Sequence, residues 1–99
     1  MLHIVNKSHT QSSALRSCLR LALPGQALLL TEDAVYAATA SAAAASGIAA
    51  AAAKLKVYAL QPDVQARGMA AKLIDGVTAV GYDGFVDLVA EHSTNQIWL

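Results

Sequence analysis

Short apolar runs alternate with helical patterns along the chain. Five runs have the length and composition of strands: Leu2–Val5, Gln26–Leu30, Lys56–Leu60, Val77–Tyr82 and Asn95–Leu99. The second ends in three leucines, as buried parallel strands do. Strands that alternate with helices form parallel sheets with helices on both faces. The pattern therefore predicts one α/β domain over residues 1–99, with three α/β/α layers and a five-stranded, mostly parallel sheet.

The first helix follows a polar, serine-rich loop, Asn6–Ser13, and is expected to run to about Leu23, where a Pro-Gly pair ends it. At about 100° per residue, its apolar side chains share one wide face, and Arg16 and Arg20 lie on the other. The apolar set is Ala14, Leu15, Cys18, Leu19, Leu21 and Ala22. This face is expected to pack on the sheet.

An alanine-rich tract, Thr39–Ala53, separates the second and third strands, and Ile48 is its only large aliphatic residue. A membrane span needs about 20 strongly apolar residues, so we do not interpret the tract as one. Alanine favours helices, and we expect a helix that is interrupted near Gly47 and packs loosely. Further helices are expected from about Ala34, from Pro62 and over Asp83–Ser93.

The charge balance and the low fraction of charged residues indicate which kinds of partner the chain can bind. Seven acidic and seven basic side chains balance, without a basic cluster, so direct binding to nucleic acid is not expected. Charged residues make up 14% of the chain, against about 25% in ordinary soluble domains. The few charges indicate that part of the surface contacts partner subunits. The start of the chain lacks the order of a signal peptide, and the single cysteine forms no internal disulfide, so a cytoplasmic location is expected.

The loops at the carboxyl ends of the predicted strands are the natural places for function. Asn6–Gln11 contains no glycine, which argues against a dinucleotide fingerprint or a P-loop, although its Ser and Thr residues could still cradle a phosphate. Glu32 and Asp33 could form a paired acid–base site, but helix capping by Asp33 is the simpler interpretation, with Thr31 as the other candidate cap. Arg67 could bind an anion, lie in solvent or lie at an interface.

The histidines and the cysteine do not form a metal site. His3, His9 and His92 lack metal-ligand spacing, and one cysteine cannot complete a zinc set, so no metal or cofactor is expected. His92 can serve as a favourable cation at a helix C-terminus, and a loop histidine such as His9 is most often solvated.

Cys18 leaves two interpretations open. A buried free cysteine behaves as a small apolar side chain, and its place on the apolar face favours that role. A reactive thiol needs access and a lowered pKa. Arg16 and Arg20 lie around the helix from the sulfur, and Cys18 lies beyond the first turn, so the residues alone do not indicate activation.

Four segments resemble the DsrH/TusB family of sulfur-relay proteins. They are "MLHIVNKS", "LLLTEDAVYAA", "LKVYALQPDVQARG" and "YDGFVDLVAEHSTNQIWL". Together they cover nearly everything outside Thr39–Ala53, and the last is the most specific. The cysteine in the first helix resembles the DsrH branch. Family members often have glycine where Ala34 stands, so a positive φ there would disfavour alanine.

The resemblance implies a DsrEFH-like fold and an accessory, mainly non-catalytic subunit. Such a subunit assembles with DsrE/TusD-like and DsrF/TusC-like subunits into a heterohexamer, which relays persulfide sulfur to a DsrC/TusE-like carrier. The sulfur serves tRNA wobble 2-thiouridine synthesis or intracellular sulfur oxidation. Cys18 is the only possible persulfide site, and packing remains its equal alternative. Two other functions stay open: a stand-alone flavodoxin-like small-molecule binder using Asn6–Gln11, and a self-associating domain.

Overall fold

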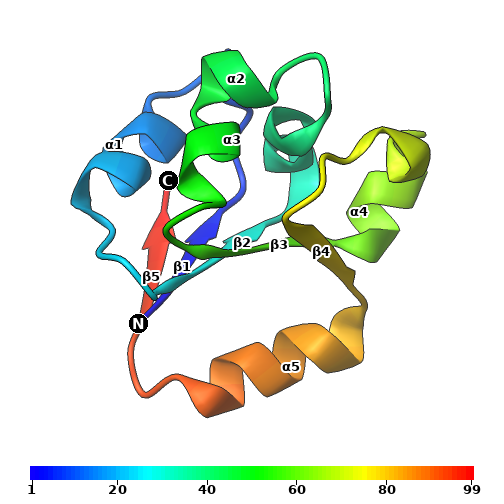
Figure 1. Cartoon of the computed structure of the whole chain (residues 1–99). Coiled ribbons are helices and arrows are strands. Elements are labelled where there is room, and N and C mark those ends of the chain that lie inside the picture. The colour runs from blue at the N-terminus through cyan, green and yellow to red at the C-terminus, as the bar shows by residue number, and fades with distance from the viewer.

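The computed structural model describes residues 1–99 and is built around one sheet (Figure 1). Its strands are β1 (Leu2–Val5), β2 (Ala27–Leu30), β3 (Lys56–Leu60), β4 (Val77–Val80) and β5 (Asn95–Trp98). Their order is β4-β3-β2-β1-β5, and all four pairings are parallel. The predicted α/β fold with a five-stranded sheet is confirmed. Flavodoxin has the order 2-1-3-4-5, so the topology gives the flavodoxin-like alternative no support.

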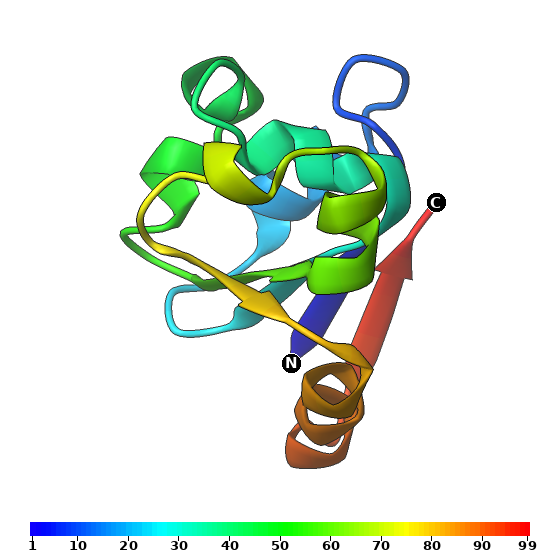
Figure 2. The same cartoon turned by 90° about the vertical axis from the view of Figure 1, so that its right-hand side faces the viewer.

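The helices form two unequal layers. They are α1 (Ala14–Leu21), η1 (Glu32–Ala38), α2 (Ala43–Ser46), α3 (Ile48–Ala51), α4 (Gln61–Ala66), η2 (Ala70–Lys72) and α5 (Tyr82–Glu91). Connections from β1 to β4 step in one direction, and the connection to β5 returns across the sheet. Because such crossovers are right-handed, the returning helix lies on the opposite face. Figures 1 and 2 show α5 alone below the sheet and the other helical segments above it.

The two central strands are buried throughout. Every residue of β1 and β2 is buried, which explains their continuous apolar character. The core above the sheet contains 16 buried residues, drawn from the strands, α1, η1, α3 and α4. The core below contains five: Leu2, Ile4, Ala27, Leu29 and Leu88. Leu88 is the one buried residue that α5 contributes, and the partly buried Phe85 of the same helix packs against this core.

The alanine-rich tract folds as two short helices that meet at Gly47, as predicted. Gly47 has φ 91°, in the left-handed region that glycine adopts readily. Ala43, Ile48 and Ala51 of the tract are buried, while most of its other residues are exposed or half-buried and hollows remain between it and α1. The Ser46 hydroxyl also donates to the Ala37 carbonyl at 2.8 Å, which ties the tract to η1.

Three local predictions need correction. α1 ends at Leu21, and the Leu21 side chain is 61% exposed, because it lies at the end of the helix and away from the sheet. The segment after β2 is a 3-10 helix rather than an α-helix. The positive φ in this turn falls on Glu32 (50°), the only non-glycine residue with one, so Ala34 needs no glycine-like conformation. The predicted start and end of α4 are confirmed, because Pro62 lies in its first turn and Gly68, with φ 66°, follows its end.

Gly47→Ala should destabilise the fold more than Gly25→Ala. Both glycines have positive φ, which costs alanine ~1–2 kcal/mol. A Cβ at Gly47 would lie 2.9 Å from Leu19 Cδ1, whereas nothing lies within 4 Å of one at Gly25. Overpacking at Gly47 should therefore add about 1 kcal/mol, at the low end of its usual range, because Leu19 Cδ1 is the free end of a side chain that can turn towards the neighbouring hollow. Urea unfolding of both variants measures the difference, and equal losses of stability would contradict close packing of α1 against the α2–α3 junction.

Candidate functional site

The carboxyl edge of the sheet brings together the ends of all five strands, as the parallel topology requires. A hollow of about 380 Å³ opens there on the α5 side. Its lining is Ile4, Asn6, Thr31, Glu32, Leu60, Asp63, Tyr82, Phe85 and Ile97. Asn6 Oδ1 is buried without a hydrogen-bond partner, and the strained Glu32 donates its N–H to Asp63 Oδ2 at 2.7 Å. The edge is polar near β1 and β2 and apolar towards α5.

Arg67 is paired with the two aspartates beside it, Asp33 and Asp63. Arg67 Nε donates to Asp33 Oδ1 at 2.9 Å, and Nη1 donates to the Asp63 carbonyl at 3.2 Å. Of the two candidate caps of η1, Thr31 occupies the N-cap position and Asp33 does not, and no side-chain capping bond forms. The anion-binding interpretation of Arg67 is wrong, because its guanidinium is already paired with carboxylates.

Two of the three histidines have structural partners. His3 is buried and lies between Gln26 Oε1, 2.7 Å from Nε2, and Trp98, whose Nε1 donates to Nδ1 at 3.2 Å. These bonds join β1 to β5 and to the start of β2. His92 follows α5, and its Nδ1 lies 2.8 Å from the Leu88 carbonyl, so it closes the last turn. No group of three or more His, Cys, Asp or Glu side chains is placed to hold a metal ion.

Cys18 lies inside the upper core. Its exposed fraction is 0%, and it belongs to the same apolar cluster as Leu15 and Val5. Desolvation by burial raises the pKa of the thiol from 9.0 to about 12. Neither Arg16 nor Arg20 lies in this core, since both are exposed. The thiol is therefore protonated and shielded at neutral pH in this conformation.

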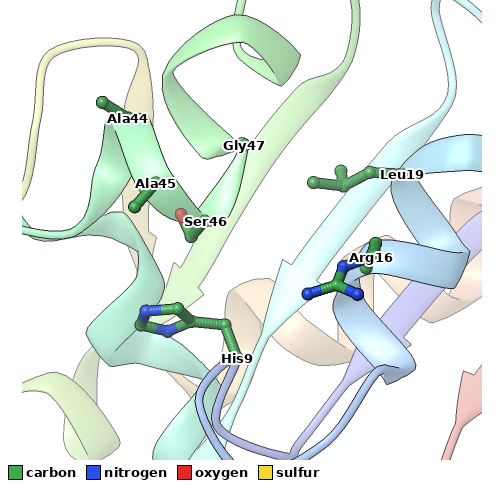
Figure 3. Close-up of a pocket in the computed structure, with 7 residues that line it drawn as sticks. All are labelled: His9, Arg16, Leu19, Ala44, Ala45, Ser46 and Gly47. Carbon is green, nitrogen blue, oxygen red and sulfur yellow. The ribbon is translucent and has the colours of Figure 1, made fainter.

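His9 and Arg16 meet at a second hollow, which the sequence did not indicate. Figure 3 shows His9 and Arg16 lining one hollow opposite the α2–α3 segment, with the His9 ring extending towards Ser46 and the Arg16 guanidinium on the α1 side. His9 comes from the loop between β1 and α1, and Arg16 from the first turn of α1. The bare alanines of α2 and the Gly47 backbone form the facing wall. No acidic residue lines this hollow.

α5 presents an uncovered apolar flank. Phe85, Val86, Val89 and Ala90 line a wholly apolar hollow of about 270 Å³ on it. Val86 is 65% exposed, and the neighbouring Tyr82 and Ile97 are also exposed. At about 100° per residue, the acidic side chains of α5 border this flank on one side. They are Asp83, Asp87 and Glu91.

These features define a small α/β/α protein with a parallel sheet, an apolar surface suited to assembly and no cluster of metal ligands. None of its helices combines the length and apolar character needed to cross a bilayer. A family model described as "DsrH like protein" matches residues 7–95. The chain therefore belongs to the DsrH/TusB family, as the sequence resemblance indicated.

Individual relatives agree with this assignment. The chain is 37% identical over 98 residues to protein TusB of Serratia proteamaculans and 35% identical over 100 residues to protein TusB of Shigella flexneri. Each match covers 99% of this chain and all of the relative. The crystal structure of the ychN protein from E. coli has the same fold, with a TM-score of 0.82 over 98% of this chain and 97% of that one, at 21% identity.

Burial of Cys18 predicts a characteristic loss of stability in alkali. Below pH 9.0 the thiol is protonated in both the folded and the unfolded chain, so it adds no pH dependence. Between pH 9.0 and about 12 only the unfolded chain ionises, and the free energy of unfolding falls by ~1.4 kcal/mol per pH unit from this group. Denaturant unfolding of the wild type and of Cys18→Ala at pH 8 to 10.5 measures the free energy of unfolding of each. The difference between their pH dependences is the contribution of Cys18. Equal slopes, or rapid reaction of the native thiol with an alkylating reagent, would contradict the burial.

Proposed function

We propose that the chain is an accessory subunit of a cytoplasmic sulfur-relay complex. Its partners are DsrE/TusD-like and DsrF/TusC-like subunits, and the complex passes persulfide sulfur to a DsrC/TusE-like carrier. The observation that carries this proposal is the match to the family along the whole chain. The TusB names of the relatives support the branch that makes 2-thiouridine at the tRNA wobble position. The cysteine in α1 keeps sulfur oxidation as the second candidate.

The uncovered flank of α5 supports a role in assembly. One helix covers the lower face of the sheet, and its exposed apolar residues include Val86 and Val89. When a partner covers exposed apolar area of this kind, the area is removed from water and the free energy of the complex falls. The acidic border of α5 has no basic residue within the helix. The partner surface is therefore an apolar patch with lysine or arginine at its rim.

Cys18 fits a structural role in the isolated subunit. As a persulfide site, its thiolate would attack the outer sulfur of an incoming persulfide, form Cys18–S–SH and release the donor as a thiolate. That step needs the Sγ atom at the surface and ionised, and burial opposes both conditions. We therefore assign the relay chemistry to the partner subunits and the contacts that hold the complex to this chain. A persulfide on Cys18 requires α1 to move away from the sheet.

Val86→Asp should weaken the complex. Placing a carboxylate in an apolar interface beside an already acidic border adds desolvation and repulsion, and affinity for the partner subunits should fall by at least about tenfold. Leu21→Asp is the matched control, since Leu21 is 61% exposed, Val86 is 65% exposed and α1 lies on the other face of the sheet. Co-purification with co-expressed DsrE- and DsrF-like proteins measures both. Retention of Val86→Asp would exclude the α5 flank as the interface, and failure of the wild type to co-purify would contradict the proposed function.

Treatment with a persulfide donor should leave the mass of the isolated wild-type chain unchanged. Burial keeps Sγ from the donor, so no gain of one sulfur (about 32 Da) is expected under conditions that load a DsrE-like partner. Mass spectrometry of the wild type beside Cys18→Ala provides the readout. A gain that reductant reverses and that Cys18→Ala lacks would make Cys18 a sulfur site and overturn its structural assignment.

A further inference from the structure

A hollow lies between α1 and the α2–α3 junction, and the proposed relay function does not account for the residues that line it. Its volume is about 300 Å³, at the lower end of the range for small-molecule sites. The seven lining residues are His9, Arg16, Leu19, Ala44, Ala45, Ser46 and Gly47 (Figure 3). The α2–α3 side contributes almost no side-chain bulk, so the space remains open in front of the two nitrogen-bearing side chains.

The two nitrogen-bearing side chains that line this hollow have no hydrogen-bond or ion-pair partners within the chain. Both ion pairs of the molecule belong to Arg67, and Arg16 forms none. His9 forms no side-chain hydrogen bond within the chain, and its Nδ1 atom is buried beneath the surface of the hollow. The Ser46 hydroxyl is different, because it already donates to backbone carbonyls. The available polar groups of the hollow are therefore a guanidinium and an imidazole.

The position of Arg16 is unfavourable for the helix that carries it. Arg16 lies in the first turn of α1, where the helix dipole disfavours a cation, and no acidic residue lies in that turn to compensate. Arg20 lies in the last turn, where a cation is favourable. Helix stability thus accounts for Arg20 and leaves Arg16 unexplained. The positive charge and the positive end of α1 both act on the hollow.

We propose that this hollow binds a small oxyanion of the sulfate, thiosulfate or phosphate type. The planar guanidinium can donate two parallel hydrogen bonds to two oxygens of such an anion, and the His9 ring borders the same hollow. No carboxylate lines the hollow to repel the anion. Asp33 lines the adjoining hollow beyond His9, but Arg67 pairs with it at 2.9 Å. The site does not depend on the proposed relay function.

Titration of the folded protein with sodium sulfate, thiosulfate and phosphate tests the site, against sodium chloride at matched ionic strength. The His9 ring signals in NMR spectra are the readout, assigned with His9→Asn. At least one oxyanion should give a saturable shift that chloride does not. Arg16→Gln should weaken that binding about 10- to 100-fold, the loss expected for a charge-assisted hydrogen-bonded contact. Arg16→Lys, which keeps the charge without the fork, should lose less.

Arg20→Gln is the matched control, because Arg20 is an exposed arginine of the same helix and does not line the hollow. Its binding should stay within about twofold of the wild type, since a screened charge outside the site contributes little. Equal weakening in Arg16→Gln and Arg20→Gln would show only a general attraction of anions to α1 and would overturn the proposal. Shifts that rise linearly without saturating, or no shift with any of the three oxyanions, would also overturn it.

Discussion

The right-handed path of the crossovers determines the rest of this structure. Three connections step from β1 towards β4 and place their helices on one face, and the last connection returns to β5 across the other face. A chain of 99 residues has only one helix, α5, left for the second face. The upper core is therefore thick, and the lower core remains thin. The exposed apolar flank of α5 follows from this topology. A subunit that assembles with others can use it as a contact surface.

Small side chains have two effects in the upper layer. Gly47 lets the α2–α3 junction contact Leu19 of α1, and Ile48 reaches the core even though the tract carries little apolar area. The same small residues fill no space on the outer side of α1, and the hollow in front of His9 and Arg16 results. The alanine-rich tract can therefore bury specific residues in the core and also border a hollow on the surface, because small side chains leave space unfilled.

Strands and fold class were accessible from the sequence because continuous apolar runs, such as the one in β2, have few other interpretations. Local predictions failed where tertiary contacts decide. Asp33 is a residue type that often caps helices. In the folded chain α4 lies beside η1, so Asp33 pairs with Arg67 at the end of α4 instead. Leu21 satisfies the helical wheel but lies beyond the edge of the core. The hollow could not be predicted, because it depends on how α1 meets α2 and α3. Its one signal in the sequence is Arg16, a cation at the wrong end of a helix.

The position of Cys18 relative to that cation separates two possible activities of α1. Residues two apart on a helix point in nearly opposite directions, so the thiol faces the sheet while Arg16 faces outward. An anion held by Arg16 therefore cannot act on the sulfur while α1 packs on β1. Rotation that exposed Cys18 would withdraw Leu15 from the core and turn Arg16 away from His9. A single conformation can support the oxyanion site or an exposed thiol but not both, and the packing of α1 against the sheet selects the first.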